Sequence, residues 1–186
     1  MVVFDTTVLL LVLQPTARPP IDPKTGVPIE HARERINFLI RTLSKARTTI
    51  LIPTPVLAEI LIRAGGATDE YLNVLNHSSV FNIADFDQKA AVEHAQITAQ
   101  HLAASGRKAI TPQETWAKMK FDWQIVAIAK VNGVTKIYAD DNDDLKRAAG
   151  IAGIAVEHTW ELPIAPEDKQ GALPLSEPKG EEKPTS

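Results

Sequence analysis

Four acidic residues in this chain stand where α/β proteins commonly build their catalytic sites. Asp5 and Asp141 each follow a short run of apolar or β-branched residues that predicts a buried strand. Glu59 and Asp122 lie in the first turns of apolar helical patterns. In an open parallel sheet, strand ends and helix starts meet at the carboxyl edge, where ligands bind. We therefore expect these four side chains to converge.

Carboxylates that converge in this way repel one another unless some of them are protonated or a cation lies between them. Oxygen ligands in a chain without cysteine favour a hard divalent cation, Mg²⁺ or Mn²⁺. Each acid taken alone also fits a structural role. Asp5 and Asp122 fit helix caps, and Glu59 fits a solvated helix face. The four together favour a metal-dependent catalytic site.

Composition indicates one domain of ordinary size, since 44% of the 186 residues are hydrophobic and 23% are charged. The absence of cysteine excludes disulfides, thiolate metal sites and cysteine nucleophiles, and it suits a reducing cytoplasm. No apolar run reaches membrane-spanning length, because the run from Val8 to Leu13 stops at Gln14. No positive region precedes the N-terminal apolar stretch, so a signal peptide is not expected.

The net charge of −3 lies entirely in the last part of the chain. Residues 161–186 contain six acids and three bases, which leaves 17 residues of each sign in residues 1–160. If four of those acids surround a metal ion, the remaining surface is basic by about four charges. The charge balance therefore permits a ligand with a phosphate backbone without being diagnostic of one.

Helical and strand patterns alternate along the chain, which predicts a three-layer α/β/α fold with a parallel central sheet. Thr54 is the expected cap of the third helix, with Pro55 at its first position and Gly65-Gly66 at its end. Residues 107–120 are ambiguous, with a turn and then a helical turn after Thr111-Pro112. The expected strands are 2–4, 49–52, 80–83, 136–139 and 154–157, and the expected helices are 7–13, 31–47, 55–64, 68–76, 87–104, 121–131 and 141–149.

Two segments stand outside this alternation. Residues 14–30 contain five of the thirteen prolines together with Gly26, and they predict an unusually long loop. Residues 161–186 are rich in proline and charge and poor in large apolar groups, which is typical of a flexible tail. We therefore expect one domain over residues 1–160, followed by a tail over 161–186.

Four segments of the sequence resemble the PIN domain family, the metal-dependent nuclease fold that includes the VapC toxins of toxin–antitoxin pairs. The resemblance covers about residues 1–160, and the four segments occur in the family's order. They read Phe-Asp5-Thr-Thr-Val-Leu-Leu, Pro-Thr-Pro-Val-Leu-Ala-Glu59-Ile, Phe-Asp122-Trp-Gln-Ile-Val-Ala-Ile-Ala and Ile-Tyr-Ala-Asp-Asp141-Asn-Asp-Asp144-Leu.

The resemblance implies a catalytic cluster and a metal site made of the same acids. Asp5, Glu59, Asp122 and Asp141 would be catalytic, and these four with Asp144 would bind Mg²⁺ or Mn²⁺. Thr6 or Thr7 would supply a hydroxyl beside the first aspartate. The ion would lower the pKa of a bound water and stabilise charge on a phosphodiester. The implied function is a metal-dependent ribonuclease, with an antitoxin protein as candidate partner and a homodimer as candidate assembly.

Basic residues near Asp122 are the candidate contacts to RNA. Arg107, Lys108, Lys118 and Lys120 flank this acid in the sequence. The basic face of the 31–47 helix is the weaker candidate, because such a face is usually just solvated.

Two other functions compete with the ribonuclease. An aspartate-based phosphatase needs a second acid two residues after the first, and that position holds Thr7. A non-catalytic PIN-like protein that binds nucleic acid stays open, because intact metal ligands do not prove turnover. A nucleotide-binding module is disfavoured, because the chain has neither a Gly-x-Gly-x-x-Gly segment nor a phosphate loop.

Overall fold

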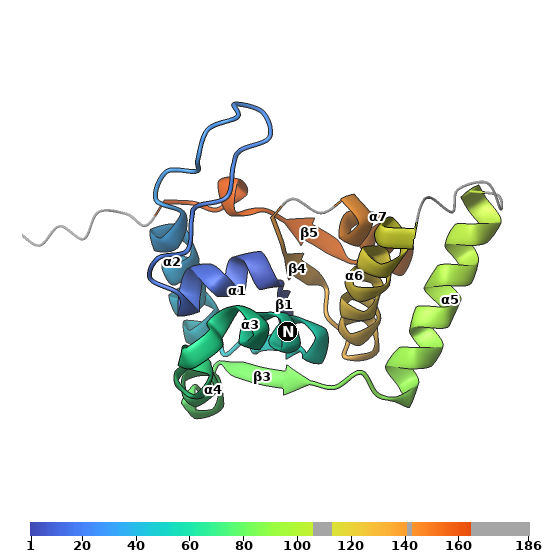
Figure 1. Ribbon diagram of the computed structural model, residues 1–186, viewed down its shortest axis with the longest axis horizontal. Coiled ribbons are helices and arrows are strands. Elements are labelled where there is room, and N and C mark those ends of the chain that lie inside the picture. Colours follow the sequence, from blue (N-terminus) through green and yellow to red (C-terminus); the bar gives the residue numbers. More distant parts are fainter. Residues whose placement is uncertain (106–112, 141–142, 165–186) are drawn as a thin grey trace, which may run out of the picture.

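The structure, a computed structural model, describes residues 1–105, 113–140 and 143–164. Its centre is a five-stranded sheet in the order β3-β2-β1-β4-β5 (Figure 1). All four strand pairs are parallel, which confirms the predicted sheet. The strands are β1 (Val2–Phe4), β2 (Ile50–Pro53), β3 (Phe81–Ala84), β4 (Lys136–Tyr138) and β5 (Ala155–Glu157).

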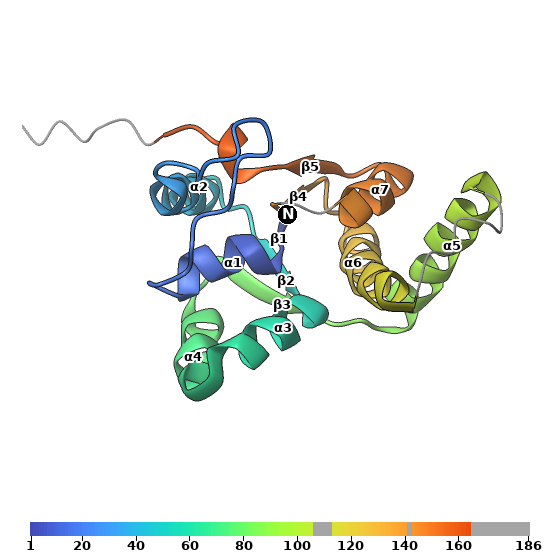
Figure 2. The same cartoon turned by 45° about the horizontal axis from the view of Figure 1, so that its top comes forward.

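Helices flank the sheet on both sides, so the predicted α/β class is confirmed. In two views α1 and α2 lie on one side of the strands, and α5, α6 and α7 lie on the other (Figures 1 and 2). The α-helices are α1 (Thr6–Leu13), α2 (Ala32–Lys45), α3 (Thr54–Ala64), α4 (Thr68–His77), α5 (Gln88–Ser105), α6 (Gln113–Val131) and α7 (Asp143–Ala152). Short 3-10 helices follow α3 and β5, η1 (Gly65–Ala67) and η3 (Thr159–Glu161).

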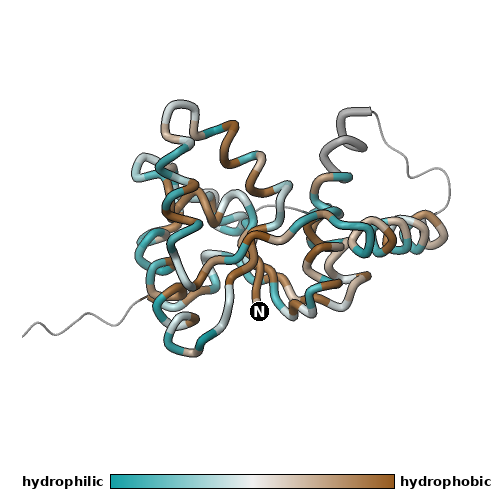
Figure 3. Tube along the Cα trace, turned by 90° about the horizontal axis from the view of Figure 1, so that it is seen from below, coloured by the Kyte–Doolittle hydropathy of each residue, from teal (hydrophilic) through white to brown (hydrophobic). Residues whose placement is uncertain are grey.

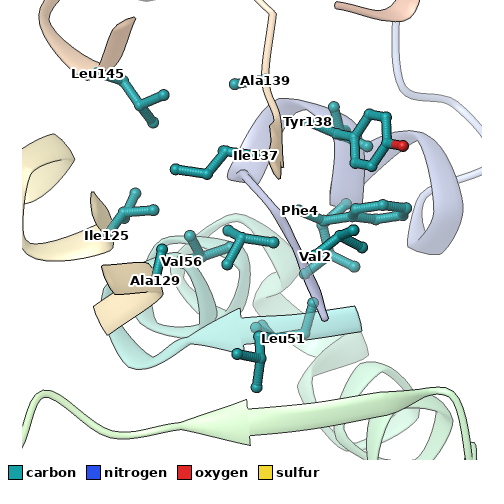
Figure 4. Packing of buried hydrophobic residues seen from close by; sticks show 14 of the residues in the cluster. Val2, Phe4, Leu51, Val56, Ile125, Ala129, Ile137, Tyr138, Ala139 and Leu145 are labelled. Atoms are coloured by element: carbon teal, nitrogen blue, oxygen red, sulfur yellow. The ribbon is translucent and has the colours of Figure 1, made fainter. Parts of the chain in front are cut away.

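The central strands β1 and β2 are apolar along their length because both faces of the sheet are covered there. Every residue of β1 and β2 is buried, and the strands form the hydrophobic centre of the chain trace (Figure 3). Successive side chains point to opposite faces of the sheet. Ile137 points toward Ile125 and Leu145, whereas Tyr138 lies beside Phe4 on the other face (Figure 4). The Phe4 and Tyr138 rings meet edge to face, with centroids 5.6 Å apart.

The 14–30 segment is a loop, as expected, and α2 holds its first residues. The Arg33 guanidinium donates hydrogen bonds to three backbone carbonyls, those of Leu11, Gln14 at 2.7 Å and Pro15 at 3.0 Å. Farther along, Ile21 and Pro28 form an antiparallel bridge. The start of the loop is therefore tied to the domain by a charged side chain.

Two sequence predictions about helix starts were wrong. Helix α6 begins at Gln113 rather than Phe121, so Asp122 lies inside the helix and not in its first turn. Thr54 is not a helix cap, because its hydroxyl accepts a hydrogen bond from the distant Phe86 N–H at 3.1 Å. Gly65 does close α3, with a positive φ of 54°.

The described chain continues in contact with the domain after η3. Leu162 is buried in the core cluster, and the Arg35 side chain donates a hydrogen bond to its carbonyl. Residues 165–186, most of the predicted tail, lie outside the described residues. None of the helices that the structure describes is long and apolar enough to cross a membrane.

Candidate active site

Asp5 lies at the carboxyl end of the central strand β1 and also caps α1. Its Oδ1 accepts a hydrogen bond from the Val8 N–H at 3.0 Å, and its own N–H donates to the Tyr138 carbonyl at 3.0 Å. The side chain is buried, with 5% of its surface exposed. Asp5 therefore does cap α1, which is the structural role considered for it in the sequence. This capping hydrogen bond holds the other carboxylate oxygen near the edge of the sheet.

Asp5 is surrounded by other acids. Burial raises its pKa well above the ordinary value of 3.8, and the negative charges of Asp140, Asp122 and Glu59 raise it further. The hydrogen bond from Val8 acts in the opposite direction but is outweighed. All four carboxylates line one cavity of about 860 Å³. Three of the predicted site residues, Asp5, Glu59 and Asp122, thus come together.

Glu59 is held from two sides. The Thr6 hydroxyl donates to Glu59 Oε2 at 2.7 Å, and the Arg63 guanidinium pairs with Glu59 Oε1 at 2.6 Å. Thr6 is buried at the start of α1, whereas the Glu59–Arg63 pair is half exposed on α3. Thr6 therefore links the acid on α3 to the helix that Asp5 caps.

Asp140 also lines the cavity and was not among the predicted site residues. Only 3% of its surface is exposed, and both carboxylate oxygens accept hydrogen bonds from Thr159, from the N–H at 2.7 Å and from the hydroxyl at 2.6 Å. The strand register explains its position. Phe4 pairs with Tyr138, so Asp140 follows the end of β4 almost level with Asp5.

The other predicted residues are placed differently. Asp144 lies in the first turn of α7, forms an ion pair with Arg147 at 3.1 Å, and does not line the cavity. Lys120 is exposed on α6 and does not line the cavity either. The predictions for Asp141, Arg107, Lys108 and the Lys118 side chain fall outside the described residues.

The donor set suits a hard divalent cation by its chemistry. It consists of carboxylate and hydroxyl oxygens, and a cation would reverse the repulsion that raises the Asp5 pKa. Among the residues that the structure describes, however, no three histidine, aspartate or glutamate side chains lie close enough together to hold an ion. The Glu59 carboxylate is already engaged by the Thr6 hydroxyl and the Arg63 guanidinium.

No protein-family model and no curated protein sequence matches this chain. Solved structures do match it. In the crystal structure of VapBC2 from Rickettsia felis bound to a DNA fragment from their promoter, one chain is similar with a TM-score of 0.56. The similarity covers 85% of this chain and 98% of that chain, at 16% identity. The fold is PIN-like.

Two other solved structures match the PIN-like fold at lower scores. DNA-bound VapBC from Salmonella typhimurium has a TM-score of 0.48 at 23% identity, covering 85% of this chain and 97% of that chain. VapC20 from Mycobacterium tuberculosis, described as a sarcin-ricin loop cleaving toxin, has a TM-score of 0.46 at 14% identity, covering 83% and 99%. The similarity to the Rickettsia felis structure, at 16% identity, establishes the PIN-like fold alone, and the activity has to be argued from the residues.

We predict that Asp5 makes the protein less stable as the pH rises. Its pKa is raised on folding, so above pH 3.8 the folded state keeps a proton that the unfolded state releases. The stability from this group is fully present below the unfolded pKa and is lost as the pH rises through the folded pKa. Asp5→Asn keeps the oxygen that caps α1 and removes the titration.

Urea unfolding of both proteins in a chelating buffer, from about pH 4 to about pH 8, would measure this effect. The unfolding free energy of Asp5→Asn, relative to that of the wild type, should increase as the pH rises and then level off. A difference that stays constant over this range would show that the Asp5 pKa is not raised by folding.

Proposed function

We propose that this chain is a metal-dependent endoribonuclease whose site is formed by Asp5, Glu59, Asp122 and Asp140. The observation that carries the proposal is the gathering of these acids in one cavity at the carboxyl edge of a PIN-like sheet. In parallel sheets this edge is where ligands bind. Asp141 and Asp144 remain candidate ligands from the same segment of the chain.

The proposed chemistry divides between the ion and the residues. A bound Mg²⁺ or Mn²⁺ would supply a water of lowered pKa and would stabilise negative charge on the phosphate. Asp5, Asp122 and Asp140 would hold the ion from three separate segments of the chain. Thr6 keeps the Glu59 carboxylate turned into the cavity by its hydrogen bond. Asp5 and Asp140 are buried, so bulk water has little access to the inner wall of the cavity.

A cleavage assay tests this proposal directly. Single-stranded RNA should be cut in the presence of Mg²⁺ or Mn²⁺, and excess chelator should stop the reaction. Asp122→Asn should lose most of the activity, because it removes a charge that holds the ion. The matched control is Asp69→Asn, which changes an exposed acid on α4 outside the cavity.

The outcomes separate the enzyme from a binding protein. Cleavage that persists in chelator would exclude a metal mechanism. RNA binding without cleavage over a broad panel of RNAs would favour the non-catalytic PIN-like protein, the alternative supported by the lack of a three-ligand group among the described residues.

We also propose a toxin–antitoxin setting, with an antitoxin protein as partner and a homodimer as the assembly. The proposal is supported by the similarity to chains of VapBC crystal structures. The product of a neighbouring small gene should co-purify with this chain and inhibit its RNA cleavage. Active protein that neither binds nor responds to any neighbouring gene product would contradict the toxin setting.

A further inference from the structure

Two large apolar side chains line the cavity and are exposed. Phe121 on α6 has 58% of its surface exposed and Ile62 on α3 has 82%. Single exposed apolar residues are ordinary on protein surfaces. These two, however, line the cavity that holds the acids, and Phe121 directly precedes Asp122. An aromatic ring there is available to a ligand that reaches the acids.

Two arginines line the same cavity. Arg18 comes from the 14–30 loop and Arg63 from α3, and both are exposed. Arg33 ties the first residues of that loop to α2, which keeps Arg18 near the cavity. Arg63 pairs with Glu59, but an exposed pair of this kind stabilises a protein only weakly. Arg63 can therefore exchange Glu59 for a phosphate group at low cost.

We propose that the rim of the cavity binds single-stranded RNA, with Phe121 stacking on an unpaired base and Arg18 and Arg63 contacting phosphates. This inference rests on the proposed nuclease function and names residues that position its substrate. An aromatic ring stacks on a base only when that base is free to leave its helix, so the site selects unpaired RNA. Two arginines in the lining of the same cavity favour a polyanion over an apolar protein segment.

The test measures RNA affinity by fluorescence anisotropy. All variants carry Asp122→Asn as well, so that the RNA is not cleaved during the measurement. Phe121→Ala should weaken binding of a single-stranded oligonucleotide about 5- to 150-fold, the range found for loss of base stacking. Phe121→Trp should restore the affinity. Val92→Ala is the matched control, because Val92 is similarly exposed, at 53%, but does not line the cavity.

Abasic oligonucleotides isolate the stacking. On an oligonucleotide that lacks the stacking base, Phe121→Ala and the protein that retains Phe121 should have equal RNA affinity. A penalty that stays the same on abasic RNA would overturn the stacking role. Should Phe121→Ala fail to fold, Phe121→Leu keeps much of the volume without the aromatic face, and the same loss is expected. Unchanged RNA affinity in both variants, with loss of a protein partner instead, would make the rim a protein-docking surface.

The salt dependence of binding tests the arginines. On single-stranded nucleic acid each phosphate contact contributes about 0.7 to the slope of log affinity against log salt. Arg18→Gln combined with Arg63→Gln should lower the slope by about 1.4, whereas Arg41→Gln, an exposed arginine on α2 outside the cavity, should not change it. An unchanged slope in the double variant would remove both arginines from the interface. Wild-type protein that binds RNA in this way but does not cleave it would refute the proposed nuclease activity and would still support the proposed RNA interface.

Discussion

The substitution Asp5→Asn is expected to reduce RNA cleavage at least about a thousandfold while the protein stays folded. Asparagine has nearly the same shape and keeps the oxygen that accepts the Val8 hydrogen bond. It lacks the negative charge that would hold a divalent ion. A metal stabilises transition-state charge by several kcal/mol, and every 1.4 kcal/mol is about a factor of ten in rate.

Three measurements together make this prediction decisive. Cleavage is followed by gel, Mn²⁺ affinity by calorimetry, and folding by thermal melting in chelator. Asp5→Asn should bind Mn²⁺ more weakly and should melt at the same or a higher temperature, because the buried charge costs stability. Wild-type cleavage or wild-type Mn²⁺ affinity in this variant would remove Asp5 from the site.

The substitution Asp140→Ala is expected to lower the free energy of unfolding by about 2–4 kcal/mol. It leaves the Thr159 N–H and hydroxyl without the acceptors that now bind them at 2.7 and 2.6 Å. Thr159 is only 1% exposed, so water cannot easily replace the lost acceptors. Relief of the repulsion between Asp140 and Asp5 offsets part of this loss. Chemical denaturation at neutral pH measures the difference.

Two variants separate the hydrogen bonds from the charge. Asp140→Asn keeps one acceptor oxygen and an amide that can donate to the Thr159 hydroxyl, so its stability should lie between the wild type and Asp140→Ala. Thr159→Val removes only the hydroxyl and should cost about 1 kcal/mol. If Asp140→Ala is as stable as the wild type, Asp140 does not anchor η3, and the carboxylate is present only for the site.

The parts of the fold that could be predicted from sequence are those that local physics determines. The runs Val2–Phe4 and Ile50–Pro53 are apolar at every position because both sheet faces are covered, and this pattern is visible without coordinates. Gly65 ends α3 because its positive φ suits a residue without Cβ. Asp5 was found because it follows a buried strand, and the structure shows that it also caps the next helix.

One error comes from a contact between distant residues, and the others from ambiguous local sequence. The Thr54 hydroxyl binds the Phe86 N–H, 32 positions away, and nothing near Thr54 signals that partner. The start of α6 was missed because residues 113–120 lack a clear apolar period. Asp141 was chosen over Asp140 because the family resemblance placed the fourth acid there, and the five successive polar residues from Asp140 to Asp144 leave the sheet-edge position ambiguous.

The central position of β1 has a consequence for the order in which the molecule is assembled. Val2 pairs with Ile50 on one side and with Lys136 on the other. Strand β1 is synthesised before β4 and therefore waits for a neighbour that is made 134 residues later, on the order of ten seconds at typical translation rates. Pairings so distant in sequence form slowly. During that interval an apolar strand lacks one neighbour and the cavity is incomplete, because Asp140 has not yet been synthesised.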